Sequence, residues 1–227
     1  MFPNEIWTKI LSNLDWKELV LLTRVCKSFE QLIKSYHWSH EIKLLNVKMI
    51  ASFVPKYRFQ NYNFYFVNVT NTELIYLSQI HTLNLRNCFK ITDVGLIHLL
   101  QIHTLNLRWC IKITDAGLIH LSEVHTLNLR GCDGITDVGL IHLSQVHTLN
   151  LKTCNQITDI GLIHLSQVHT LNLLGCNQIT DAGLVHLSQV HMLNHLSCYQ
   201  ITDVGLIHLS QVHTLDLRDA IKLQTSD

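Results

Sequence analysis

The stretch from His125 to Val146, HTLNLRGCDGITDVGLIHLSQV, decides the fold of this chain because close copies of it follow one another. A cysteine recurs every 22 residues, and a glycine runs alongside it at the same interval. The cysteines are Cys88, Cys110, Cys132, Cys154, Cys176 and Cys198, and the glycines are Gly95, Gly117, Gly139, Gly161, Gly183 and Gly205. A fixed period of this length is typical of a solenoid, in which one small unit stacks on copies of itself. Because a solenoid offers a long repeated surface and no deep cleft, we expect a binding protein.

Each unit reads as one short strand followed by one short helix. Leu127 and Leu129 alternate with Asn128, which is the period of a strand with one buried face. Thr136 or Asp137 can cap a helix that turns its leucines inward. Neighbouring strands of such a stack lie about 4.8 Å apart, so seven of them would span roughly 30 Å.

The pattern C-x-x-I-T-D-x-G-L, which begins at Cys132 in this copy, resembles the cysteine-containing subtype of leucine-rich repeats. The resemblance covers about residues 69–223, and a degenerate first copy places Leu74 and Leu77 on the inward side of its helix. It implies an α/β fold, a right-handed horseshoe with a parallel sheet on the concave side and helices on the convex side. Repeats of that subtype usually have a few more residues, so we expect short helices here.

The first forty residues have a different pattern, that of three short helices. Ile6, Ile10, Leu11 and Leu14 have helical spacing after Pro3. Residues 15–18, DWKE, form a capping box that opens a second helix through Val25. A third helix follows from Cys26 to Ile33, with Trp38 near its end. Three short helices bury little surface alone, so such a unit usually needs a partner.

The N-terminal pattern F-P-N-E-I-x-x-x-I-L-x-x-L-D, continued by Leu19 and by V-C-K-x-F at residues 25–29, resembles the F-box motif. The resemblance implies a substrate receptor of a Skp–cullin–F-box ubiquitin ligase, whose F-box docks the Skp adaptor and, through it, cullin. By motif position the adaptor contacts would be Pro3, Ile10, Leu11, Leu14, Leu19, Val25 and Cys26. The alternative is that about half of these side chains only pack the three helices together.

We therefore divide the chain into an F-box (1–42), a junction (43–68) and a solenoid of 22-residue repeats (69–227). In the junction we expect a helix from Met49 to Val54 and then a strand that covers the first repeat. Linker chemistry based on Gly and Ser is nearly absent there, so we expect a rigid connection.

The repeated cysteines and histidines are residue types that bind metals or take part in catalysis. The cysteines form a line of single thiols, whereas structural zinc needs close pairs that converge on one ion, so we expect buried packing residues and no metal or cofactor. The column from His81 to His213 is expected to hold neutral, solvated imidazoles whose mutual repulsion lowers their pKa values. No nucleophile is paired with a base, so an enzyme has little support. One copy carries His195 where the others have an inward leucine, and we expect a weak point there.

The positions that differ between the copies lie at the ends of the strands, where repeat proteins recognise their ligands. We expect an acidic or phosphorylated segment of a target protein on the concave face, held by a column of basic side chains with an aromatic anchor. An equally supported alternative is that these charges are merely solvated. The residues of this candidate substrate site are Arg86, Arg108, Trp109, Arg130, Lys152 and Leu174. The asparagine column, Asn84 to Asn194, is expected to form a side-chain ladder on the sheet.

The composition fits this interpretation. Hydrophobic residues make up 47% of the chain and charged residues only 15%, as expected when most positions serve stacking. The net charge of zero gives no electrostatic case for a nucleic acid or an anionic membrane. Seven cysteines, six of them in one column, favour reduced thiols in the cytoplasm or nucleus, or in the host cytoplasm if the source is viral or bacterial. The leading hypothesis is a non-catalytic ubiquitin-ligase receptor, and the alternative is an interaction scaffold without a ligase role.

Overall fold

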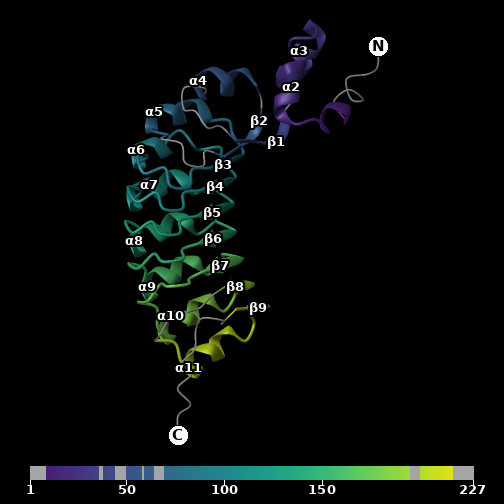
Figure 1. Cartoon of the computed structure of the whole chain (residues 1–227). Coiled ribbons are helices and arrows are strands. Elements are labelled where there is room, and N and C mark those ends of the chain that lie inside the picture. Colours follow the sequence, from purple (N-terminus) through teal and green to yellow (C-terminus); the bar gives the residue numbers. More distant parts are fainter. Residues whose placement is uncertain are drawn as a thin grey trace.

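The chain folds into one curved stack with a small helical unit at its N-terminal end (Figure 1). The computed structural model describes residues 9–35, 38–43, 50–57, 59–63, 69–194 and 200–216. Nine strands lie side by side in the order in which they occur in the chain, and all neighbouring pairs are parallel. Short helices cover one face of this sheet along its length (Figure 1). The expected α/β leucine-rich-repeat solenoid is confirmed.

The strands are β1 (Trp38–Lys43), β2 (Phe59–Asn63), β3 (Thr82–Asn84), β4 (Thr104–Asn106), β5 (Thr126–Asn128), β6 (Thr148–Asn150), β7 (Thr170–Asn172), β8 (Met192–Asn194) and β9 (Thr214–Leu215). The α-helices are α2 (Trp16–Leu22), α3 (Lys27–Ser35), α4 (Ile50–Phe53), α5 (Asn71–Leu74), α6 (Asp93–Leu96), α7 (Asp115–Leu118), α8 (Asp137–Leu140), α9 (Asp159–Leu162), α10 (Asp181–Leu184) and α11 (Asp203–Leu206). The 3-10 helices are η2 (Val54–Lys56), η3 (Ile75–Leu77), η4 (Ile119–Leu121), η5 (Ile141–Leu143), η6 (Ile163–Leu165), η7 (Val185–Leu187) and η8 (Ile207–Leu209).

The register of the sheet follows the sequence period. Leu105 lies opposite Leu127, and each following strand repeats this pairing at a shift of 22 residues. The leucine in the middle of each of the strands β3 to β8 is buried, and its two neighbours are half-buried on the other face. The buried leucines therefore form a continuous core between sheet and helices, which a chain with one 22-residue unit repeated in register must produce.

The short helices are tied to one another at their N-termini. Thr136 is the N-cap of α8, and its hydroxyl accepts a hydrogen bond from the backbone N–H of Val138. Asp137 is the first helical residue, so threonine is the cap of the two candidates. The aspartate at the start of each helix instead forms hydrogen bonds with the next unit. Asp115, in the unit before Thr136, accepts hydrogen bonds from the N–H of Thr136 at 2.8 Å and from its hydroxyl at 2.6 Å.

The same aspartate-to-threonine pair links the other units. It joins Asp93 to Thr114, Asp137 to Thr158, Asp159 to Thr180 and Asp181 to Thr202. In the first unit Asn71 replaces the aspartate and forms the hydrogen bonds with Thr92. This ladder explains the glycine column. A Cβ atom on Gly139 would overlap Oδ1 of Asp115 and lie 2.9 Å from Cδ1 of Leu118. Glycine is therefore needed because the carboxylate of the preceding unit occupies the space of its side chain.

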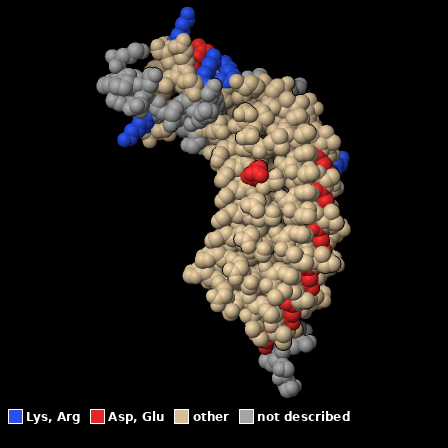
Figure 2. All heavy atoms as spheres, turned by 180° about the vertical axis from the view of Figure 1, so that it is seen from behind, with Lys and Arg blue, Asp and Glu red and all other residues tan. Residues whose placement is uncertain are grey.

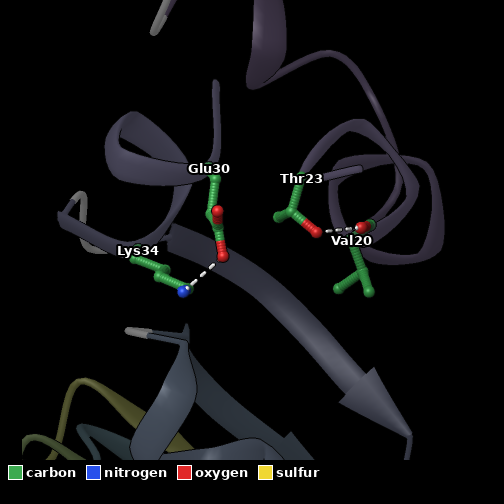
Figure 3. A network of polar contacts seen from close by, with 4 residues as sticks. All are labelled: Val20, Thr23, Glu30 and Lys34. Atoms are coloured by element: carbon green, nitrogen blue, oxygen red, sulfur yellow. Dashed lines mark hydrogen bonds and ion pairs between the residues drawn. The ribbon is translucent and has the colours of Figure 1, made fainter. Parts of the chain in front are cut away.

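The N-terminal helices differ from the expectation in their bounds. The Asp15–Glu18 capping box is present, but α2 ends at Leu22 and does not reach Val25, and α3 begins after Cys26. Polar contacts hold both helices, with Thr23 donating to the carbonyl of Val20 and Lys34 paired with Glu30 at 2.6 Å (Figure 3). The ammonium of Lys34 lowers the pKa of the Glu30 carboxyl.

The junction is a packed part of the stack. Strands β3 to β9 are the seven strands of the repeats, and β2 lies in the segment 43–68, where a strand that covers the first repeat is expected. Strand β1 is additional: it begins at Trp38, inside the segment 1–42 assigned to the F-box. Of the helix expected from Met49 to Val54, Ile50–Phe53 form α4, Val54 begins η2, which also holds Pro55, and Met49 lies outside the described residues. The indole N–H of Trp38 donates to the carbonyl of Ile33 at 2.8 Å, which fastens α3 to the sheet.

Pro3, His195 and Cys198 lie outside the described residues, and so does everything beyond Asp216. Within the described ranges, the helices are all too short or too polar to cross a membrane.

Candidate functional site

The face of the sheet that points away from the helices carries the predicted basic column. Arg86, Arg108, Arg130 and Lys152 each come two residues after a strand and are half-buried. Their backbones are hydrogen-bonded laterally: the N–H of Asn87 donates to the carbonyl of Arg108 at 2.9 Å, and later units repeat this bond at 2.8–3.0 Å. Strands in such contact lie about 4.8 Å apart, so the four cations stand in register along one edge of the concave face.

The asparagines of the strands set the direction of the chain at this edge. Oδ1 of Asn128 accepts a hydrogen bond from the N–H of Arg130 at 3.0 Å, and the same bond recurs in the neighbouring units. Each asparagine thus closes a turn within its own unit. We expected hydrogen bonds from one asparagine to the next along the sheet. The hydrogen bonds of the asparagine side-chain carbonyls instead stay within each unit, because an Asx turn satisfies them locally.

The residue after each basic position has a left-handed backbone. φ is +62° at Asn87, +60° at Trp109, +69° at Gly131, +61° at Thr153 and +78° at Gly175. Glycine and asparagine adopt this conformation readily, whereas a bulky or β-branched residue does so at a cost of about 1–3 kcal/mol. Asn87, Gly131 and Gly175 are residue types that favour a left-handed backbone, so the sequence contains a signal for this turn beside the variation that suggested ligand binding.

Trp109 is the one aromatic residue among these turns. Its ring lies across the next unit, so that a Cβ atom on Gly131 would overlap it. The ring is half-buried and stands between the strand ends that carry Arg108 and Arg130. Leu174, the predicted apolar neighbour, is only 9% exposed and belongs mainly to the core. The structure therefore brings the four cations and Trp109 together and leaves Leu174 little surface to offer.

The predicted adaptor contacts fall into two groups. Leu11 and Leu19 are 2% and 0% exposed and pack in the core, and Leu14 is half-buried against it. Ile10 and Val25 are 49% and 65% exposed, and Cys26 is exposed as well. Leu21, which the motif comparison missed, is 58% exposed. Its exposure follows from its position: in α2 it lies two residues from the buried Leu19 and hence on the opposite side of the helix.

The cysteine column is structural. Cys110, Cys132, Cys154 and Cys176 are buried, and each thiol donates to the carbonyl of a leucine 25 residues earlier at 3.2–3.3 Å. Burial raises the pKa of the Cys88, Cys110 and Cys154 thiols to about 12. A thiol with such a pKa is a poor nucleophile and a poor metal ligand at neutral pH. The prediction that these residues pack the core is confirmed.

The histidines before the strands form a continuous stack. From His81 to His213 the ring centroids of neighbouring units lie 4.5–4.7 Å apart, with interplanar angles of 8–29°. Desolvation and the charge of the neighbouring imidazoles lower the pKa of His103, His147 and His191. The expected direction of the shift is confirmed for these three. Among the described residues, no group of three or more His, Cys, Asp or Glu side chains is arranged to hold a metal ion.

Comparison with known proteins supports both parts of the chain. The family model described as F-box-like matches residues 2–40, and the model described as Leucine Rich repeat matches residues 123–144 and 168–188. A search of curated proteins finds no match.

Three solved structures resemble the fold. Rad7, from the yeast complex of Rad7 and Elc1, is 17% identical with a TM-score of 0.56, and the match covers 71% of this chain and 50% of Rad7. TLR13, from its complex with ssRNA13, is 15% identical with a TM-score of 0.63, over 84% of this chain and 30% of TLR13. The internalin InlF of Listeria monocytogenes is 21% identical with a TM-score of 0.53, over 80% of this chain and 56% of InlF.

The chain thus spans between about a third and a little over half of the structures that it resembles. At these identities the likeness concerns the fold. The two family models identify an F-box-like segment followed by leucine-rich repeats in this chain, and the solved structures share the repeat fold.

Proposed function

We propose that the protein is the substrate-recognition subunit of a Skp–cullin–F-box ubiquitin ligase. A chain with an F-box-like segment and leucine-rich repeats is a protein-interaction module, and the more specific role requires that the F-box binds a Skp adaptor. The observation that carries the proposal is the exposed apolar surface of the F-box, which consists of Ile10, Leu21, Val25 and Cys26. The rest of the F-box is packed on the sheet through Trp38 and Leu19, so these side chains remain available for a partner.

Two further points support this assignment. Rad7, one of the proteins of similar fold, was solved in complex with Elc1. Among the predicted contacts, Leu11 and Leu19 are buried and pack the F-box itself, whereas Ile10 and Val25 are exposed and can contact a partner. Exposed aliphatic side chains clustered on a small helical unit are the usual anchors of a protein interface.

Copurification of the full chain with a Skp adaptor tests the proposal. We expect the wild-type chain to retain the adaptor and the variant Val25→Glu to lose it, because a carboxylate would be buried without a partner in the interface. Ile111→Glu is the matched control, since Ile111 is 52% exposed in a repeat far from the F-box. If the wild-type chain does not retain the adaptor, the protein is an interaction scaffold and not a ligase receptor.

For the substrate we propose an acidic or phosphorylated segment on the concave face. Support comes from the four cations in register, Arg86, Arg108, Arg130 and Lys152, and from the strained turn at Trp109 between two of them. Backbone strain of this kind is found most often at binding and switch sites. The apolar part of the ligand would lie on the Trp109 ring, because Leu174 is mostly buried.

An array of acidic and phosphorylated peptides tests the substrate class. We expect the double variant Arg108→Glu and Arg130→Glu to lose the peptides that the wild-type chain binds and to keep the Skp adaptor. The control is Lys90→Glu with Lys112→Glu, which makes the same change of charge at two exposed turn residues. If the arginine variant binds the same peptides as the wild type, the concave column is only solvated charge.

A further inference from the structure

The outer side of the helices carries exposed aliphatic side chains that neither proposed interface uses. We call this surface the apolar stripe. It consists of Ile75, Val94, Ile97, Ile119, Val138, Ile141, Ile160, Ile163, Val185, Val204 and Ile207, which are 46–73% exposed. Ala116 and Ala182 complete one of its two columns and are exposed as well.

The stripe is continuous because the helices that carry it are stacked. Each helix from α5 to α11 packs against the helix of the next unit, so side chains at equivalent positions follow one another along the molecule. On the face that Figure 2 shows, acidic side chains form a file along the helical side, a separate acidic patch lies away from it, and there is almost no lysine or arginine over the repeats. An exposed apolar surface of this length is typical of an interface with another protein.

Two polar columns flank the stripe. Within each helical segment the order along the chain is aspartate, two exposed aliphatic positions and histidine, as in Asp137, Val138, Ile141 and His142. Residues four apart are neighbours on a helix surface, so Asp137 lies beside Ile141 and His142 beside Val138. The aspartates therefore run along one border of the stripe and the histidines, from His98 to His208, along the other. Both columns remain at least partly exposed to solvent.

We propose that the apolar stripe binds a second copy of this chain and makes the protein a dimer. The area supports this occupant. At about 30 Å² for each aliphatic carbon, the exposed parts of the eleven side chains amount to about 700 Å². A stable interface of standard size buries about 800 Å² on each partner, so the stripe together with its flanking polar columns provides an area of the size that a dimer needs.

The flanking columns select the orientation of the dimer. If the two-fold axis runs along the solenoid, the aspartate column of one copy faces the histidine column of its partner, and imidazole N–H groups can donate to carboxylates. If the axis runs across the solenoid, aspartates face aspartates and repel. The structure therefore favours two solenoids packed back to back with their N-termini at the same end. Because the outer face is slightly curved (Figure 1), the middle units, α8 and α9, lie at the centre of the contact.

The proposal does not depend on adaptor binding, and the oligomeric state of the full chain tests it. We expect sedimentation velocity to show a dimer with a dissociation constant in the micromolar range or below. The double variant Ile141→Lys and Ile163→Lys should raise this constant at least about 100-fold, since two lysine charges would be buried in each copy's interface. Both residues are half exposed, so the circular dichroism spectrum should remain that of the wild type.

A control and a second variant separate the contact from general effects of charge. Asn155→Lys with Asn177→Lys adds the same charge at exposed turns outside the stripe and should leave the dimer intact. His142→Glu with His164→Glu places carboxylates opposite the partner's aspartates and should weaken the dimer about tenfold. A wild-type chain that stays monomeric at all concentrations, or a lysine variant that still dimerises, would overturn the proposal and leave the stripe to a different protein. A dimer unaffected by the glutamate variant would overturn the proposed orientation.

Discussion

Single residues show how tightly neighbouring units are fitted together. The aspartate at the start of each helix accepts two hydrogen bonds from the threonine of the next unit, and the glycine of that unit leaves space for the carboxylate. Three residues from two units thus depend on one another. A duplicated sequence keeps all three together, which accounts for the unbroken aspartate and glycine columns.

Gly139→Ala should lower the free energy of unfolding by about 1–3 kcal/mol. Alanine is the better helix former by about 1 kcal/mol, but its Cβ atom would displace the Asp115 carboxylate from Thr136. Urea denaturation measures the change, and Gln145→Ala, at an exposed position outside the apolar stripe, is the control. In the background Asp115→Ala the same glycine substitution should cost less than it does alone. Additive effects of the two substitutions would show that they do not share this contact.

Thr153→Asn should raise the free energy of unfolding by about 1 kcal/mol. Thr153 is β-branched and has a φ of +61°, whereas asparagine tolerates this region and occupies it in Asn87. Thr148→Asn in strand β6 is the matched control and should be destabilising, because asparagine is disfavoured in strands. A thermal melt that falls for both variants would show that Thr153 is not strained.

The repeated elements were largely predictable, and the residues at their contacts were less so. The burial of Leu127, Leu140 and Cys132 can be predicted from the pattern of apolar residues within one repeat. The part played by Asp115 depends on which residue of the next unit lies beside it, and that follows only from the lateral packing of the helices. Strand β1 was missed for a similar reason: Trp38 fits the end of a helical pattern, and only its pairing with β2 makes it the first strand.

The candidate site was predictable in its positions but not in its backbone. The positions of Arg108 and Trp109 are ones at which the units differ from one another, and this variation pointed to the strand ends. That Trp109 adopts a left-handed conformation, and that its ring lies over Gly131, depends on how the turns stack. In the F-box, the motif alone did not separate Leu19, which is buried, from Val25, which is exposed.

At the scale of a whole column, the stacked histidines should make stability depend on pH. The pKa of His103, His147 and His191 is lower in the folded state than in the unfolded chain. The unfolded chain therefore binds more protons near pH 6, so stability is complete above about pH 6.5 and is lost as the pH falls below it. The melting temperature should fall between pH 7.5 and pH 5.5, which calorimetry measures.

Replacing His103, His147 and His191 with glutamine isolates this column, because every second ring of the stack is removed and the remaining rings lose their charged neighbours. The pH dependence of the melting temperature should then flatten. A wild-type protein that melts at the same temperature over this pH range would contradict the predicted effect.

On the scale of the molecule, the F-box and the solenoid share one core. Phe53 contacts Trp16 edge to face at a centroid distance of 5.7 Å and stacks on Phe59 at 5.9 Å. It therefore links α2 with the second strand of the sheet. This arrangement fixes the position of the F-box helices relative to the repeats, as the proposed receptor function would require.

Phe53→Ala should lower the free energy of unfolding by about 3–5 kcal/mol, because a large buried side chain is removed from a shared core. Hydrogen exchange should show loss of protection in the F-box helices α2 and α3 and also in strand β2, since the F-box and the sheet lose Phe53 as their shared packing partner. Leu149→Ala, an equally buried truncation in the middle of the stack, is the control. In a solenoid each unit contacts mainly its neighbours, so this second variant should lose protection around β6 and keep it in the F-box helices. If Phe53→Ala changes exchange in the sheet alone, the F-box folds independently, and its position relative to the repeats is not set by this core.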